Sequence, residues 1–295
     1  MKNWKLNVAV MAMMGATTIS CEKEIMNLAT NTYTASEQSS VQMTVSSQSM
    51  DSEIDAVSFN SRGISMTDLE QRLPQGVKIT DSGADVYPRT ITIDFGTGIT
   101  DNNGRVKSGK IIVSMTNDMT VVGAVRTVKL DDFKVDDLTM NGLQTMTNLQ
   151  MNGVEPVFEM KDEMSMTDKE GMETTQVNEG TKTWIEGFGD DDMSNDIFTM
   201  EGTAKMRNSN MSMVKTILRP LVINRSCKHI VQGVIEMNNN GEVSSIDFGN
   251  GDCDSKAVLT KNGETIGIDL DNMCGGDPKP QDSDSYSNQT TNSAS

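Results

Sequence analysis

The chain has 295 residues, of which 36% are hydrophobic and only 4% are aromatic. Its formal net charge is −17 and its pI is about 4.4. Nucleic acid and anionic bilayers repel an acidic surface, so this charge argues against both as direct partners. The lone histidine and the few aromatic side chains also leave little material for histidine-based catalysis or for stacking sugars.

The first 20 residues have the pattern of a secretory signal peptide. Lys2 and Lys5 form a short basic region, and a mostly apolar run follows over residues 6–14. This run is too short to span a bilayer, which needs ~20 apolar residues. Thr-Ile-Ser then precedes Cys21, which resembles a bacterial lipobox. We expect residues 1–20 to be removed and Cys21 to be lipidated; the alternative is an ordinary signal peptide followed by a chance cysteine.

The expected lipid determines the expected location. Several acyl chains on one cysteine hold a protein stably at a membrane. The charged triplet Glu22-Lys23-Glu24 follows Cys21 and resembles the surface-export tag of Bacteroidota lipoproteins. We therefore expect an outer-membrane lipoprotein that faces either the periplasm or the cell surface. Its one predicted partner is that membrane, reached through the lipid, while a protein or glycan partner stays unspecified.

Two polar segments flank a long central region. Residues 21–62 are rich in Ser, Thr, Gln and Asn, and this composition predicts a flexible tether. Residues 275–295 contain almost no apolar residue and are predicted to be a disordered tail. The region between them, residues 63–274, is predicted to be the folded domain. It opens with the capping-box pattern Thr67-Asp68-Leu69-Glu70, so we expect one short N-terminal helix that ends before Pro74.

The rest of the central region alternates apolar and polar residues with a period of two, which is typical of strands. Strands are predicted near residues 90–95, 108–116, 121–131, 143–150, 155–166, 172–186, 197–206, 211–223, 229–237, 243–248, 256–261 and 264–270. Asn-Gly pairs, the strongest short hairpin signal, begin at residues 103, 141, 152, 240 and 262. The predicted class is all-β: an antiparallel, hairpin-rich meander in one large curved sheet or in a sandwich of two sub-sheets.

Several blocks of this region resemble an uncharacterised family of Bacteroidota lipoproteins. The blocks are Thr90–Gly96 with Ser108–Val113, Thr181–Gly187, and Arg225–Val231 with Gly233, Ile246–Gly249 and Cys253-Asp254. The resemblance covers about residues 85–270. It implies a lipoprotein and brings no activity, because the function of that family is unknown. This chain often has Met where members of the family carry Thr or Val.

The cysteine count predicts one disulfide. The four cysteines are Cys21, Cys227, Cys253 and Cys274. Lipidation uses Cys21, so an exported protein is left with one pair and one spare thiol. A two-residue turn at Asn240-Gly241 pairs residues whose numbers sum to 481, which leaves Cys227 and Cys253 one residue out of register. A bulge at Gly249 or Gly251 closes that gap. We predict a Cys227–Cys253 disulfide; the rival pairing is Cys253–Cys274.

Methionine is unusually common, with 24 in the chain. Met164-Ser165-Met166 and Met211-Ser212-Met213 have the spacing of extracytoplasmic copper(I) sites, because thioethers are soft ligands. Alternate residues of a strand also line one face, however, and Met is an adaptable core residue. We favour core packing and predict no metal site and no cofactor. Similarly, Trp184 is expected to pack in the sheet.

Two acidic segments, residues 189–196 and 247–254, have oxygen ligands that suit calcium but lack the EF-hand spacing, so solvated loops are the preferred interpretation. His229 lies near Cys227, but we expect that cysteine to be oxidised, and no other catalytic motif is present. We therefore predict no catalytic residue and no enzyme.

The function expected is a structural or binding module of the cell envelope. The alternatives are a surface lipoprotein that binds a glycan or a protein, and a methionine-based periplasmic metal binder.

Overall fold

The structure is a computed structural model that describes residues 73–83, 86–100, 106–150, 155–188 and 192–270. These residues form one antiparallel sheet of 14 strands, so the predicted all-β class is confirmed. Several expectations concern residues outside this set: the signal peptide at 1–20, Cys21, the tether at 21–62, the short helix at 67–70 and the tail at 275–295. Within the described residues, no helix is long and apolar enough to cross a membrane.

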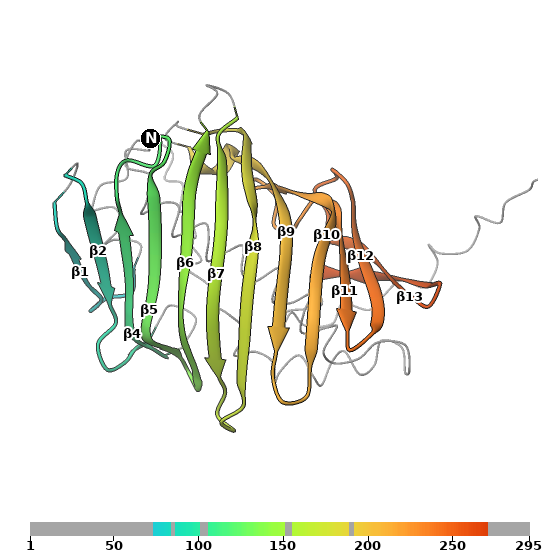
Figure 1. Cartoon of the computed structure of the whole chain (residues 1–295), viewed down its shortest axis with the longest axis horizontal. Helices are drawn as coiled ribbons and strands as arrows, with labels where there is room; N and C mark the ends of the chain where they lie inside the picture. Colours follow the sequence, from blue (N-terminus) through green and yellow to red (C-terminus); the bar gives the residue numbers. More distant parts are fainter. Residues whose placement is uncertain (1–72, 84–85, 101–105, 151–154, 189–191, 271–295) are drawn as a thin grey trace, which may run out of the picture.

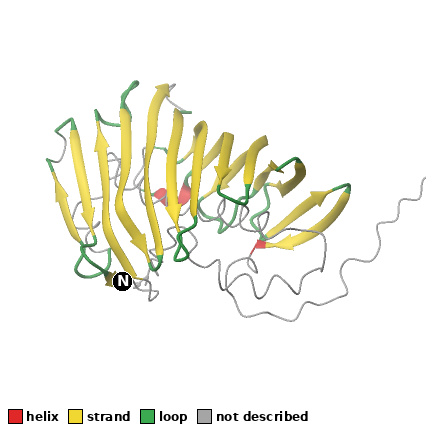
Figure 2. Ribbon diagram, turned by 60° about the horizontal axis from the view of Figure 1, so that its bottom comes forward, coloured by secondary structure: helices red, strands yellow, loops and turns green. Residues whose placement is uncertain are grey.

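The sheet is a meander, in which strands adjacent in sequence lie side by side (Figure 1). The strands are β1 (Lys78–Asp81), β2 (Arg89–Asp94), β3 (Ile99–Thr100), β4 (Val106–Met115), β5 (Val125–Val135), β6 (Leu138–Gln150), β7 (Val157–Thr167), β8 (Glu173–Glu186), β9 (Ile197–Arg207), β10 (Ser212–Asn224), β11 (Gln232–Asn239), β12 (Glu242–Asn250), β13 (Lys256–Lys261) and β14 (Glu264–Asp269). The short β3 pairs with β4 beside this path, and a 3-10 turn, η2 (Met193–Asn195), precedes β9. Of the two predicted arrangements, the strands adopt the single large sheet, which is bowed (Figure 2).

Each long strand places alternate side chains on opposite faces of the sheet. In β2 the buried positions are Arg89, Ile91 and Ile93, and the residues between them are partly exposed. The same alternation runs through β5, β7 and β12. We call the buried side of the sheet the inner face and the opposite side the outer face.

The inner face carries one continuous hydrophobic cluster. Its members include Ile91, Val113, Val128, Met140, Met146, Phe158, Met160, Met166, Trp184, Phe198, Met237 and Ile246. Burying one such aliphatic or aromatic side chain contributes about 1.5–3 kcal/mol. Trp184 packs in the sheet as predicted, with its ring centroid 5.6 Å from that of Phe158 and 5.2 Å from that of Phe198.

The Asn-Gly pairs have two different structural roles. Asn240-Gly241 and Asn262-Gly263 form hairpin turns, with Asn φ values of 53° and 54°. The turn expected at Asn141-Gly142 is wrong, because both residues lie inside β6. A side chain at Gly142 would collide with the backbone of Glu163 and Met164 on β7, so glycine is needed there for close strand approach. The pairs at residues 103 and 152 lie outside the described residues.

Candidate functional site

The predicted cysteine pair is joined in the structure. Cys227 and Cys253 form a disulfide with a Cα–Cα distance of 5.4 Å. The register of β11 with β12 is the one expected from the turn, since Ile235 faces Ile246. It shifts by one residue before Val234, where β12 accommodates the extra residue near Gly249. The expected role of this bulge is wrong: beyond it Gln232 faces Asn250, a register that would place Cys227 opposite Ser255 and so widens the mismatch. The disulfide instead joins two connections outside the ladder, the one between β10 and β11 and the one after β12.

The candidate Cys-His pair is not arranged as a nucleophile. His229 is buried in the connection between β10 and β11 rather than in a strand. The sulfur of Cys227 is part of the disulfide, so it supplies no thiolate. The disulfide gives Cys227 a structural role in the folded chain.

In the described part of the two acidic segments, several carboxylates make contacts within the chain. Asp196 is fully buried, and its carboxylate lies 3.6 Å from Nε of Arg225. Asp192 accepts a hydrogen bond from the backbone N–H of Ser194 at 2.9 Å, and hydrogen bonding by the Ser194 hydroxyl and N–H lowers the pKa of Asp192. Asp247 lies 2.6 Å from the guanidinium of Arg219. In the part of the chain that the structure describes, no three His, Cys, Asp or Glu side chains gather as a metal site.

Methionine side chains cover much of the inner face of the central strands. Met164 and Met166 both point to this buried face, as core packing predicts. Strand register places Met166 opposite Met140 and Met160 opposite Met146. A third pair of facing methionines, Met206 and Met213, lies on β9 and β10. The long, unbranched thioether side chain fills such a surface well, and its sulfur stays available as a soft ligand.

A band of polar side chains crosses this methionine-rich face. Gln144, Asp162 and Asn178 lie opposite one another on β6, β7 and β8. Arg126 donates a hydrogen bond to Gln144 at 3.2 Å, and Asn178 donates one to Asp162 at 3.2 Å. The same row continues across the sheet through Ala204, Lys215, Met237, Ser244 and Lys261.

Several cations are buried on the inner face of this acidic protein. Lys107, Arg126, Lys182 and Lys215 are all buried there. The ammonium of Lys182 lies 4.2 Å from the ring centroid of Trp184 and 4.1 Å from that of Phe198, a geometry that favours cation–π attraction. Burial lowers the pKa of Lys215 to about 8.

The outer face carries a continuous polar row, and apolar side chains such as Leu143, Val177 and Val214 are exposed beside it. One row of facing positions runs from β2 to β14 and consists of Thr90, Ser114, Thr127, Thr145, Lys161, Glu179, Thr203, Thr216, Glu236, Ser245, Thr260 and Thr265. Threonine suits both a strand and a solvated surface. In the described ranges every aromatic side chain is buried or half-buried, so this face offers no aromatic platform for sugars.

Sequence reasoning found the disulfide and missed the polar band. Its signal was present in the strand alternation, because Gln144, Asp162 and Lys215 occupy positions that the period assigns to the buried side. A polar residue at such a position marks a buried polar contact.

Comparison with known proteins found no matching family model, curated protein or solved structure.

Proposed function

We propose that this chain is a lipid-anchored protein of the bacterial cell envelope whose sheet serves as a structural or binding module, not as an enzyme. The observation that carries the proposal is the unbroken polar row on the outer face, from Thr90 to Thr265. A broad surface of hydroxyl and charged groups suits contact with a macromolecule through many weak contacts. The lipobox-like sequence before Cys21 supports the anchor, and the resemblance to Bacteroidota lipoproteins supports an outer-membrane location.

A protein is the partner class that the outer face favours over a glycan. Sugar binding gains much of its free energy from exposed aromatic rings, and the aromatic rings of the described residues lie elsewhere. Lys161 and Glu179 face each other in the row with opposite charges, which provides the mixed polarity of a protein–protein rim.

The anchor is tested by cell fractionation. Cys21→Ser is expected to release the protein from the membrane fraction or to leave an uncleaved precursor, since it removes the acylated atom. Cys274→Ser is the matched control and should fractionate like the wild type. Normal processing and membrane retention of Cys21→Ser would contradict the proposal. Protease treatment of intact cells then decides between the periplasmic and the surface side.

The binding surface is tested by photo-crosslinking in cells. A crosslinking amino acid at Thr145 or Thr203, in the middle of the outer row, should capture one discrete protein. The same amino acid at Asn262, at a hairpin tip, serves as the control and should not capture it. Lys161→Glu should reduce the yield at Thr145 because it reverses a charge on the neighbouring strand. No adduct at the row, or equal yield at Asn262, would refute the outer face as the binding surface.

A second candidate function, soft-metal binding, is favoured by the facing methionine pairs. Met140 with Met166 and Met146 with Met160 place four thioethers on adjacent strands. Copper(I) is the ion that such ligands suit best.

A further inference from the structure

The outer face carries a row of exposed side chains in which apolar and charged residues alternate from strand to strand. We call it the alternating row; it crosses β6 to β10 in direct register and consists of Leu143, Glu163, Val177, Lys205 and Val214. Leu143, Val177 and Val214 are 44%, 40% and 39% exposed, and the two charged residues are exposed as well. Single exposed apolar residues are ordinary on a protein surface, but several in one register row mark a candidate contact surface.

The alternating row is symmetric about Val177 except for the sign of its charges. One strand away on either side lies a charged residue, Glu163 on β7 and Lys205 on β9. Two strands away on either side lies an aliphatic residue, Leu143 on β6 and Val214 on β10. A row that reads the same in both directions with its charges exchanged is complementary to a second copy of itself.

A two-fold axis parallel to β8 and passing over Val177 brings two alternating rows face to face. The two Val177 side chains then meet, and Leu143 of each copy meets Val214 of the other. Glu163 of each copy meets Lys205 of the other, so every contact of this isologous interface except the central one occurs twice. An axis along the row would instead place the two Glu163 side chains opposite each other, which like charges disfavour. We propose that two copies of this chain associate through their outer faces about the axis over Val177.

The neighbouring row on the outer face fits the same axis. Lys161 on β7 faces Glu179 on β8, so the axis passes over Glu179 as well. Each Glu179 then lies between Lys161 of its own chain and Lys161 of the second copy, which offsets the approach of the two glutamates. Thr145 on β6 meets Thr216 on β10, and both carry hydroxyl groups.

The five central strands offer enough area for a stable dimer. They lie side by side in Figure 1 and contain between 11 and 14 residues each. At ~3.3 Å per residue and ~4.8 Å between strands, this part of the outer face covers roughly 850–1,100 Å². A stable interface buries about 800 Å² on each partner. Packed sheets cross at about 30°, so the contacts nearest the axis, those of Val177, Glu163 and Lys205, are expected to fit best.

Self-association rests on the proposed role of the outer face as a binding surface, and it specifies the partner as a second copy of the chain. The chain has a net charge of −17, but the alternating row contains one acidic and one basic residue and is neutral. Its own charge therefore does not oppose association. An axis parallel to the strands also leaves both copies pointing the same way along it, as two chains anchored in one membrane require.

Thiol cross-linking in isolated cell envelopes tests the arrangement in the full chain, with Cys274→Ser to remove the spare thiol. Facing sheets lie ~10 Å apart, so the reagent is a bifunctional cross-linker of about that span. Val177→Cys lies on the axis and should give a band of twice the chain mass. Leu143→Cys and Val214→Cys lie about four strand spacings, ~19 Å, from their own counterparts and should each give at least tenfold less dimer. The chain with both substitutions should recover the yield of Val177→Cys. No dimer at Val177→Cys, or equal yields at all three single positions, would overturn the proposal.

Charge exchange tests the pairing of Glu163 with Lys205 without changing a buried residue. In the Val177→Cys chain, Glu163→Lys alone and Lys205→Glu alone should each lower the dimer yield at least fivefold, because they place like charges opposite each other. Glu163→Lys/Lys205→Glu should return the yield to within twofold of the parent. Glu264→Lys, which is exposed on β14, is the matched control and should leave the yield unchanged. An exchanged pair that does not recover the yield would overturn the proposed arrangement.

Photo-crosslinking at Thr145 separates self-association from the broader proposed function. An adduct of twice the chain mass supports the dimer. An adduct with a different protein would keep the outer face as a binding surface and would overturn self-association. The absence of any adduct would refute both.

Discussion

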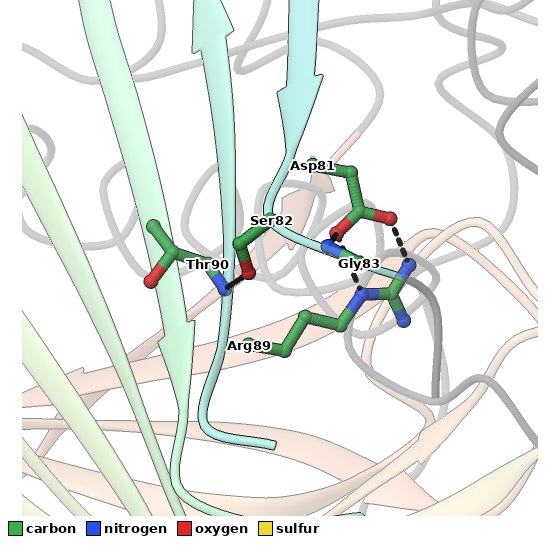
Figure 3. A network of polar contacts seen from close by, with 5 residues as sticks. All are labelled: Asp81, Ser82, Gly83, Arg89 and Thr90. Atoms are coloured by element: carbon green, nitrogen blue, oxygen red, sulfur yellow. Dashed lines mark hydrogen bonds and ion pairs between the residues drawn. The ribbon is translucent and has the colours of Figure 1, made fainter. Parts of the chain in front are cut away.

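Arg89 holds Asp81 with two parallel hydrogen bonds, from Nε to Oδ1 at 3.0 Å and from Nη2 to Oδ2 at 2.7 Å (Figure 3). The Arg89 side chain is 4% exposed and that of Asp81 is 12% exposed. Gly83 also donates its backbone N–H to Asp81, at 3.1 Å. The pKa of Asp81 is lowered, chiefly by the hydrogen bonds from Arg89. This pair fastens the short edge strand β1 to β2.

We predict that Asp81→Asn lowers the free energy of unfolding by about 2 kcal/mol at pH 7, because it leaves the Arg89 charge buried without its carboxylate. The lowered folded-state pKa means that this stabilisation is complete above about pH 4 and disappears as the pH falls through the folded value. Urea unfolding at pH 7 and pH 3 measures both effects.

The matched control is Asp94→Asn. Asp94 pairs with Lys110 at 3.2 Å, but their side chains are 30% and 47% exposed. Such surface pairs contribute less than about 1 kcal/mol. If Asp81→Asn and Asp94→Asn lower the free energy of unfolding equally, then the buried Arg89–Asp81 pair stabilises the fold no more than an exposed pair does.

The period-two pattern predicted the long strands because each has a buried and a solvated side. Strands from β4 to β13 were expected within a few residues of their observed bounds. The start of β5 was placed too early, at residue 121 instead of Val125, because Val121 and Val122 look like strand residues. Asp118 fixes a loop there by accepting hydrogen bonds from the N–H and the hydroxyl of Thr120 at 2.8 and 2.7 Å.

Short and bulged elements escaped the sequence pattern. The strands β1 and β3 are too short to show a period. The hairpin between β5 and β6 turns at Asp136-Asp137, where Asp136 adopts a φ of 52°, rather than at the nearby Asn-Gly pair. The polar band was missed because its members are brought together by register across several strands. That arrangement is not visible in any single strand.

Lys215 should make stability depend on pH in the alkaline range. It lies on β10, opposite Ala204 on β9 and Met237 on β11. Burial lowers its pKa from 10.5 to about 8. Between about pH 8 and pH 10 the unfolded chain therefore binds more protons at this lysine than the folded chain, so stability rises with pH. Below pH 8 the full cost of burying the charge is present.

We expect Lys215→Met to stabilise the protein by about 1–3 kcal/mol at pH 7 and to flatten the rise between pH 8 and pH 10. Chemical unfolding across this range measures both. Lys205→Met, on the exposed side of β9, is the control and should leave the pH slope intact. If the free energy of unfolding of Lys215→Met still rises between pH 8 and pH 10, then a group other than Lys215 titrates in this pH range.

The methionine pairs give a prediction that separates packing from metal binding. Met164→Leu/Met166→Leu conserves apolar volume, so it should lower the free energy of unfolding by less than about 1.5 kcal/mol. If these thioethers only pack, copper(I) titration monitored by thermal unfolding should give the same shift in midpoint for the variant and the wild type. Copper-dependent stabilisation that the variant loses would instead establish the soft-metal site.

The disulfide should stabilise the C-terminal half of the sheet. Cys227 and Cys253 are 26 residues apart, and a cross-link of that span adds on the order of 3 kcal/mol by restricting the unfolded chain. Cys227→Ala/Cys253→Ala should lower the urea midpoint accordingly, and a reducing agent should have the same effect on the wild type and none on the variant. Cys274→Ala is the control and should leave the midpoint unchanged. Non-reducing peptide mapping checks the pairing directly: a peptide that joins Cys253 to Cys274, or three free thiols in the mature chain, would contradict it.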